Sequence, residues 1–162
     1  MAREVMVWNK PTLIVATTET GLDTGLAVEC QVNSAVLTPV PTSQTIPATG
    51  CAPATNSPGI TGWQLELAWL QDWTKPRAES LSWFAWDNDA AQVWARLIPN
   101  RDDANAMDME GPFFAVSGGF GGTFGDGSAA ATSATWGAVD RPEITPATVV
   151  PPAAADVETV DA

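Results

Sequence analysis

The acidic side chains are the residues in this sequence whose type and spacing could support chemistry. They form three close pairs: Asp87/Asp89, Asp102/Asp103 and Asp108/Glu110. Two carboxylates facing one cleft can hydrolyse a glycosidic bond, and clustered carboxylates can bind Ca²⁺. We expect each pair to lie in or beside a polar turn, where carboxylates are normally solvated. Neither Asp102-Asp103 nor Asp126-Gly127-Ser128 has the spacing of a calcium loop. The sequence therefore predicts no catalytic pair and no metal site.

The other groups that catalysis needs are missing. The chain has no His and no Tyr, which removes the commonest general base, the commonest nitrogen ligand for metals and the phenolic acid. Ser and Thr therefore have no His to activate them, and the two lysines, Lys10 and Lys75, each precede a proline. Cys30 and Cys51 are either reduced thiols or a disulfide, and two thiols without His are too few for zinc. We predict a protein that is not an enzyme and binds no cofactor.

The stretch 118–128 holds six glycines and two phenylalanines, a composition that raises the question of a phosphate-binding loop. Its spacing fits no such loop, no Lys or Arg follows before Arg141, and no helical pattern comes after it. Strand-like segments flank it at 113–117 and 132–136. Glycine between two strands supplies positive φ angles and close backbone approach, so we predict the bend of a sheet, as a bulged hairpin.

The overall charge bears on possible partners. The net charge is −12, and the few basic residues are not clustered, which disfavours a protein that grips nucleic acid. Charged residues make up only 16% of the chain, against roughly 25% in an average soluble domain. A surface with so few charged residues suits a subunit whose faces become buried against other subunits. The eight tryptophans fit the core or subunit contacts, and exposed Trp that stack on sugars are the alternative.

Hydrophobic periodicity predicts a mainly β protein with one helix. The clearest strand is 62–70, whose alternation places Trp63, Leu65 and Leu67 on one face, and Trp136 belongs to a final strand at 130–139. An amphipathic helix is expected over 78–88. Further strands are expected at 26–37, as one strand or two with a bulge, at 91–99, and at 107–119 with an interruption near Gly111-Pro112.

The segment 38–62 is the longest stretch without a clear pattern. It carries five prolines, and no charged residue occurs from position 30 to 65. Loops this long are usually functional or disordered, and an uncharged one is suited to becoming ordered against a partner. A flexible surface loop is the alternative. We predict a binding arm for self-assembly, with candidate residues Thr38, Val40, Thr42, Ile46 and Thr49.

These elements divide the chain into three parts. Residues 1–20 form an N-terminal arm, although the β-branched run 12–18 could also be a strand. Residues 21–144 form the β domain, and residues 145–162 form a flexible, acidic C-terminal tail rich in Pro and Ala. The N-terminus lacks the apolar core of a signal peptide and no apolar run has the length of a membrane helix, so we expect synthesis in a cytoplasm without membrane insertion.

The order of these elements resembles the major tail proteins, or tail tube subunits, of long flexible-tailed (siphovirus-type) bacteriophages. The resemblance spans roughly 26–144, and five segments carry it: 51–53 (Cys-Ala-Pro), 63–73 (Trp-Gln-Leu-Glu-Leu-Ala-Trp-Leu-Gln-Asp-Trp), 82–88 (Ser-Trp-Phe-Ala-Trp-Asp-Asn), 119–122 (Gly-Phe-Gly-Gly) and 131–136 (Ala-Thr-Ser-Ala-Thr-Trp).

The resemblance implies a barrel-like β-sandwich with one flanking helix, a long loop and extended terminal arms. It also implies hexameric rings that stack into a tube around a channel for DNA. The loop 38–62 then corresponds to a long hairpin that reaches neighbouring subunits. The implied partners are the chain itself, the tape measure protein, the tail tip and the terminator, in the tail of a virion assembled in the host cytoplasm. The alternative is a monomeric β-sandwich module that binds carbohydrate.

Overall fold

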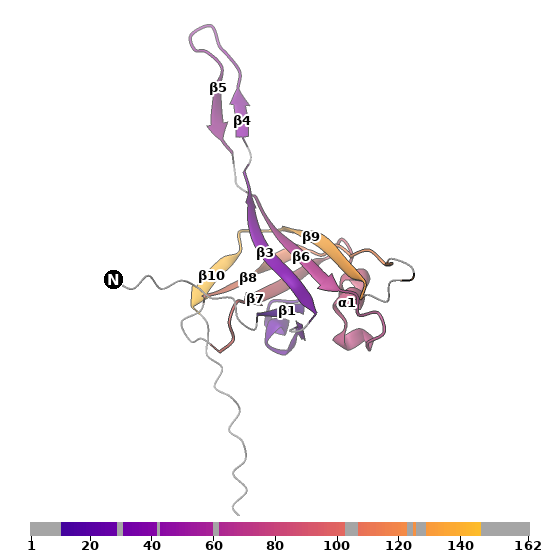
Figure 1. The fold of residues 1–162 in the computed structure, drawn as a ribbon. Coiled ribbons are helices and arrows are strands. Elements are labelled where there is room, and N and C mark those ends of the chain that lie inside the picture. Colours follow the sequence, from indigo (N-terminus) through magenta and orange to yellow (C-terminus); the bar gives the residue numbers. More distant parts are fainter. Residues whose placement is uncertain are drawn as a thin grey trace, which may run out of the picture.

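The computed structural model describes residues 11–28, 31–41, 43–59, 62–102, 107–122, 125 and 129–146. These residues form a mainly β protein (Figure 1). Its strands are β1 (Thr12–Ala16), β2 (Leu26–Val28), β3 (Val32–Val40), β4 (Ser43–Ile46), β5 (Thr55–Pro58), β6 (Gly62–Leu70), β7 (Gln92–Ile98), β8 (Met107–Phe114), β9 (Ala131–Ala138) and β10 (Glu143–Pro146). The predicted fold class, mainly β with one flanking helix, is confirmed.

An eight-stranded antiparallel sheet makes up the body of the molecule. Its order is β2-β1-β7-β8-β9-β6-β3, and β10 pairs with β8 beside that path. Strand β8 joins two parts of the sheet, because it pairs with β7 on one side and with β10 and then β9 on the other. Core residues from both parts pack into one cluster, which includes Leu13 and Val93 from one part and Leu67 and Trp136 from the other. The sheet therefore folds over one shared core, and β2 and β3 remain its edge strands.

Strand β6 contributes one apolar face to the core, as the alternation of its apolar and polar residues predicts. Leu65, Leu67 and Trp69 are fully buried, and Trp63 on the same face is half-buried. Leu65 lies opposite Trp136 of β9, which is also fully buried. The alternation of apolar and polar residues is clear in this strand because one face of β6 packs against the core while the other face is partly open.

The predicted helix forms as a 3₁₀ turn, η2 (Arg77–Glu79), followed by α1 (Leu81–Asp87). A second 3₁₀ turn, η1 (Thr20–Thr24), follows β1. Leu81 and Ala85 are buried, and the Oγ of Ser80 caps the helix by accepting a hydrogen bond from the Trp83 N–H at 3.2 Å. None of the helices in the described ranges has the length and apolar content needed to cross a bilayer.

Two sequence predictions need correction. The expected interruption at Gly111-Pro112 is wrong, because β8 runs continuously through both residues. The carbonyl of Pro112 accepts from the Val139 N–H at 2.9 Å. In a strand the N–H and C=O of one residue point the same way, so the missing N–H faces away from β7 and removes no bond from the β7–β8 ladder. In the N-terminal part, residues 12–16 form β1 between β2 and β7, so the strand alternative is correct for them.

The glycine stretch connects antiparallel strands, as predicted, but it does not close a tight hairpin. Strands β8 and β9 pair only at Phe113↔Ala138 and Phe114↔Gly137, and then separate. Gly121 and Gly125 have φ angles of 149° and 88°, in the region that favours glycine. The glycines therefore lie in a wide loop that links β8 to β9.

Gly118 is expected to tolerate no side chain. A Cβ there lies 2.6 Å from Oγ1 of Thr132 and 2.8 Å from Cζ2 of Trp69, and the Trp69 side chain is fully buried and cannot move away. We expect Gly118→Ala to lower the free energy of unfolding by about 1–3 kcal/mol. Gly119→Ala is the matched control, because its Cβ meets nothing closer than 3.6 Å. Urea unfolding of both variants tests this, and equal stability would contradict the packing described.

Candidate functional site

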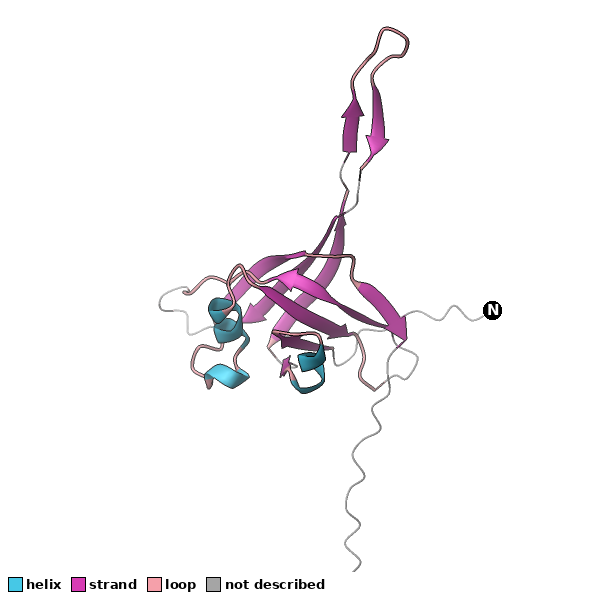
Figure 2. Ribbon diagram, turned by 180° about the vertical axis from the view of Figure 1, so that it is seen from behind, coloured by secondary structure: helices cyan, strands magenta, loops and turns pink. Residues whose placement is uncertain are grey.

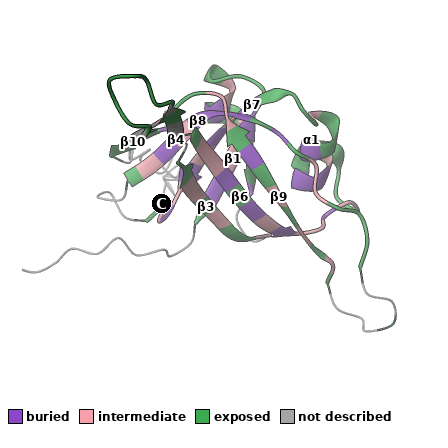
Figure 3. Cartoon of the chain, turned by 90° about the horizontal axis from the view of Figure 1, so that it is seen from above, coloured by how far each residue is buried: buried purple, intermediate pink, exposed green. Residues whose placement is uncertain are grey.

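The segment predicted as a long loop is a projecting β-hairpin. Strand β4 pairs with β5 from Ser43↔Pro58 to Ile46↔Thr55, and Thr49 and Ala52 form a bridge beyond them. The hairpin extends β3 and β6, whose pairing ends at Val40↔Gly62, and it leaves the body of the molecule (Figure 1). The loop between β4 and β5 is exposed along its length (Figure 3). The hairpin is therefore a β-structured protrusion from the body.

The described candidate assembly residues lie in β3 and in the hairpin that continues it. Thr38 and Val40 are in β3, Ile46 is in β4, and Thr49 is exposed at the tip, whereas Thr42 lies outside the described residues. The prolines in the segment fit the pairing, because Pro39 is in the edge strand β3 and Pro58 ends β5, both places where a missing N–H is tolerated. Of the four core candidates, three are buried, and Trp63 lies half-buried at the hairpin end of β6.

The main sheet has an open edge along β3. In the described part of the chain this nine-residue strand pairs with β6 alone, so its second row of backbone N–H and C=O groups has no ladder partner. Val36 and Val40 on this strand are also exposed. An unpaired edge of this length is a template for pairing with another strand, and it continues directly into the hairpin.

The outer face of β3, β6 and β9 is almost uncharged. Register pairing aligns three rows of residues on this face: Ser34/Ala68/Ser133, Val36/Glu66/Thr135 and Thr38/Gln64/Gly137. Glu66 is the only charged residue in these rows, and its carboxylate accepts a hydrogen bond from Nε2 of Gln64 at 2.8 Å. The face offers small, neutral side chains and one carboxylate to whatever lies against it.

A group of aromatic rings lies beyond the opposite end of β6. We call Trp73, Trp83, Trp86, Phe120 and Arg77 the aromatic patch. Trp73 contacts the other three rings edge to face, with centroids 5.0 Å from Trp83, 6.1 Å from Trp86 and 5.5 Å from Phe120. The Arg77 guanidinium lies 4.2 Å from the Trp83 ring centre and is paired with Asp87 at 3.5 Å. Trp86 is 55% exposed and Phe120 80% exposed, so the patch faces solvent.

Hydrogen bonds from Gln71 hold the patch together. The Gln71 side chain donates to the Gly121 carbonyl at 2.6 Å and accepts from the Gly121 N–H at 3.1 Å. The same Oε1 accepts from Nε1 of Trp73 at 3.1 Å, and Nε1 of Trp83 donates to the Trp73 carbonyl at 3.0 Å. The glycine stretch is thereby fixed so that Phe120 stands against Trp73. Sequence reasoning missed this group, because its rings come from three separate segments.

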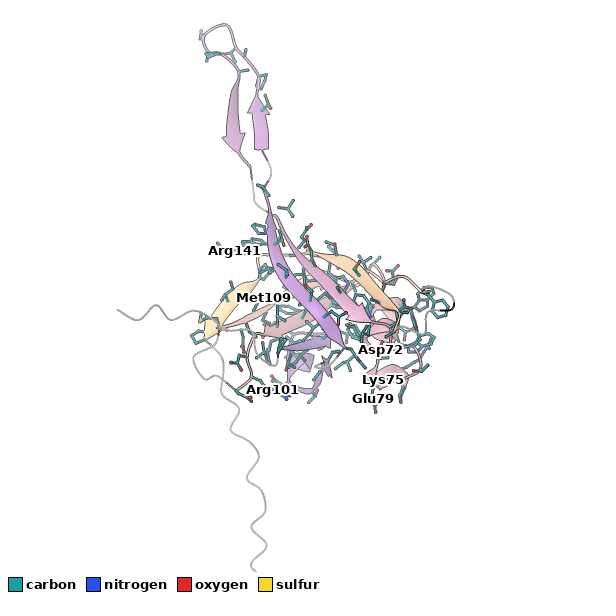
Figure 4. The ribbon with its side chains drawn as sticks, in the orientation of Figure 1. Asp72, Lys75, Glu79, Arg101, Met109 and Arg141 are labelled. Carbon is teal, nitrogen blue, oxygen red and sulfur yellow. The ribbon has the colours of Figure 1, made fainter. Side chains whose placement is uncertain are left out.

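A buried carboxylate anchors the helix that carries two of these rings. Asp72 is 5% exposed, and its oxygens accept hydrogen bonds from Oγ of Ser80 at 2.8 Å, from N–H of Leu81 at 2.9 Å and from N–H of Ser82 at 3.0 Å. Burial raises the pKa of Asp72, but the hydrogen bonds from these three residues outweigh it and hold the pKa below its ordinary value. Figure 4 places Asp72 at the α1 end of the molecule, away from the hairpin.

One carboxylate pair lies elsewhere than expected. Asp108 and Glu110 are inside β8, not in a polar turn. Glu110 accepts from Nε of Arg96 at 2.8 Å, and Arg96 also contacts Asp23 at 3.3 Å. Burial raises the pKa of Asp108, the charge of Glu110 raises it further, and Arg96 opposes both. These contacts form an ion-pair network of Arg96 with Glu110 and Asp23.

The other carboxylates form no ligand set. Asp87 and Asp89 are exposed around the end of α1, Asp102 lies in a turn, and Asp103 is outside the described residues. Within the described ranges no group of three His, Cys, Asp or Glu side chains is arranged to hold a metal ion. A groove that sequence reasoning missed brings Glu19, Glu110 and Glu143 together with Arg141, but Arg96 already engages Glu110.

Comparison with known proteins supports a fold and no closer relationship. A scan against protein-family models finds no match, and no curated protein matches. Among solved structures, a chain of the sheath–tube complex of an extracellular contractile injection system, PVC, in the extended state is similar, with a TM-score of 0.53 and 13% identity over 90% of this chain and 93% of that chain.

A second similar chain comes from the sheath/tube terminator of the same system. It has a TM-score of 0.53 and 14% identity, over 89% of this chain and 99% of that chain. At such low identity the likeness shows the fold alone. The fold is therefore of a kind found in a contractile injection system, and the likeness is not specific to siphovirus tails.

Proposed function

We propose that this chain is a structural subunit of a bacteriophage tail that assembles with copies of itself into stacked rings, hexameric as the resemblance implies. The rings form a tube through which DNA leaves the virion. In this role the subunit performs no catalysis and needs no cofactor or metal. It belongs to the tail of the virion after assembly in the host cytoplasm.

The open edge of β3, continued by the hairpin, is the observation that carries this proposal. A nine-residue edge strand is a hazard for a protein that stays alone, because any strand can pair with it. A two-stranded hairpin is also only marginally stable by itself in water. Both features become useful when the next copy in a ring pairs with the edge and another copy receives the hairpin.

The comparisons support the same reading. The two similar chains come from a sheath–tube complex and from a sheath/tube terminator, and each match covers at least 89% of this chain. The assignment to a long flexible tail rests on the resemblance of the sequence segments. The tape measure protein, the tail tip and the terminator are the further partners that this resemblance implies.

The outer face of β3, β6 and β9 is the surface we assign to the channel. Sliding DNA must meet no cluster of cations, because Lys and Arg bind phosphates tightly. In the aligned rows of this face the only charge is the Glu66 carboxylate, which repels phosphate. In a ring of identical subunits Glu66 becomes one circle of negative charges.

A monomeric carbohydrate-binding module is the second candidate. The exposure of Trp86 and Phe120 in the aromatic patch favours it, since sugars stack on exposed rings. Against it, the rings stand at 69–86° to Trp73 and make no flat platform.

Electron microscopy of the concentrated protein tests the first proposal against the second. We expect stacked rings or tubes, in the absence of added ligand or with tail-tip seeds. Protein that stays dispersed under both conditions, and whose Trp fluorescence shifts with added glycans, would favour the binding module and overturn the tube proposal.

A further inference from the structure

The hairpin tip and the aromatic patch lie at opposite ends of the molecule. Strand β6 begins at Gly62, at the base of the hairpin, and ends at Leu70, which leads into Gln71 and Trp73. A strand of nine residues spans roughly 26 Å at 3.3 Å per residue. Figures 1 and 2 show the hairpin leaving one end of the body and α1 at the other. The tip of one molecule therefore cannot reach its own patch.

The tip is a neutral surface that projects into solvent. Residues 47–54 read Pro-Ala-Thr-Gly-Cys-Ala-Pro-Ala, and all of them are exposed. A chain with a net charge of −12 repels its own copies. The hairpin lies within the stretch 30–65, which has no charged residue, so it can approach another copy without this repulsion.

The aromatic patch has the chemistry to receive such a surface. Aromatic rings form the grooves that bind prolines in many recognition domains, and Trp and Arg dominate the energetics of protein interfaces. The charge of Arg77 is already balanced by Asp87, so the patch presents rings and a neutral ion pair. It has no spare cation for an acidic ligand, which favours a neutral, proline-containing one.

We propose that the aromatic patch of one copy receives the hairpin tip of a second copy. This inference rests on the proposed self-assembly and names the surface on which the hairpin docks. Because the two surfaces differ and lie at opposite ends, the contact is heterologous, and it repeats from copy to copy instead of closing on a pair. A chain of such contacts stacks subunits along the direction of the hairpin.

Disulfide trapping tests the contact, using the native thiol of the tip. Cys51 is exposed and free. Gly119→Cys, made in a Cys30→Ser background so that Cys51 is the only other thiol, places a thiol beside Phe120. It keeps every ring of the patch and has room for the new side chain. A disulfide needs the two Cα atoms within about 7 Å. Under a mild oxidant we expect a ladder of linked oligomers that collapses with reductant.

Two controls give this experiment its specificity. Adding Cys51→Ser to the Gly119→Cys variant must abolish the ladder. Gly137→Cys, at another exposed glycine with open space around it, must give far less cross-linking. A ladder that survives Cys51→Ser, or one equally strong with Gly137→Cys, would overturn the docking proposal.

Substitution of the patch gives a second measurement. Trp86→Gln removes an exposed ring, and we expect the protein concentration needed for polymerisation to rise about tenfold or more, as for a central interface Trp. Ile144→Ser, at an exposed apolar residue of β10, should leave it unchanged. Wild-type protein that never assembles contradicts the proposed function. Wild-type tubes that form equally well with Trp86→Gln, and without trapping at Gly119→Cys, contradict this inference alone.

Discussion

Deletion of residues 42–57 is expected to leave a folded subunit that forms no tubes. The core cluster lies entirely in the body, and the β3–β6 pairing down to Val40↔Gly62 stays intact. The deletion therefore removes little that stabilises the monomer. It removes the whole of β4 and most of β5, and with them the surface that we propose reaches another copy.

Electron microscopy and sedimentation measure the effect on assembly, and circular dichroism and Trp fluorescence measure the fold. A same-length replacement of residues 47–54 by Gly and Ser keeps the length of the hairpin but removes Pro47 and Pro53 from its tip. It therefore tests whether assembly needs the sequence of the tip or only the length of the hairpin. Normal tubes from the deletion variant would show that the hairpin has no role in assembly.

Asp72→Ala is expected to produce a large loss of stability. It leaves the N–H groups of Leu81 and Ser82 and the hydroxyl of Ser80 without their carboxylate, inside a buried site. Removing a charged acceptor from buried donors costs about 3 kcal/mol. Asp72→Asn keeps one carbonyl oxygen and should lose less. Urea unfolding measures all three proteins.

Asp87→Asn is the matched control for Asp72. Asp87 also lies on α1, but it is exposed and pairs with the exposed Arg77, so we expect a change below about 1 kcal/mol. If the two aspartates prove equally dispensable, the buried network does not anchor the helix.

The stability of the protein is expected to fall in acid partly through Asp72. Its pKa is lowered in the folded state, so its stabilising contribution is complete above the pKa of an unfolded Asp, about 3.9. The contribution is lost as the pH falls from there through the lower, folded pKa. The loss of unfolding free energy below pH 4 should therefore be smaller in Asp72→Asn than in the wild type.

The parts of the fold that could be predicted from the sequence are those with one buried face. Leu65, Leu67 and Trp69 alternate with partly open residues in β6, so their period is visible. The continuous path of β8 through Pro112 could not be predicted, because it depends on which neighbour the missing N–H faces, and that is set by the tertiary register of β9 and β10.

The candidate site was predictable only in part. The missing charge and the prolines marked the segment 38–62, yet its pairing into β4 and β5 is not visible in a run that has no apolar alternation. The aromatic patch had one signal, the excess of Trp. Its assembly depends on Gln71 bonding to Gly121, fifty residues away, and no local pattern encodes such a contact.

The separation of two unlike surfaces by β6 gives any filament of this chain a direction. In a filament built on the proposed hairpin-to-patch contact, one terminus would show free hairpins and the other free aromatic rings. The two termini would then elongate by different encounters and at different speeds. A protein that caps one terminus would not bind the other. Starting and stopping such a filament therefore requires two proteins of different shape.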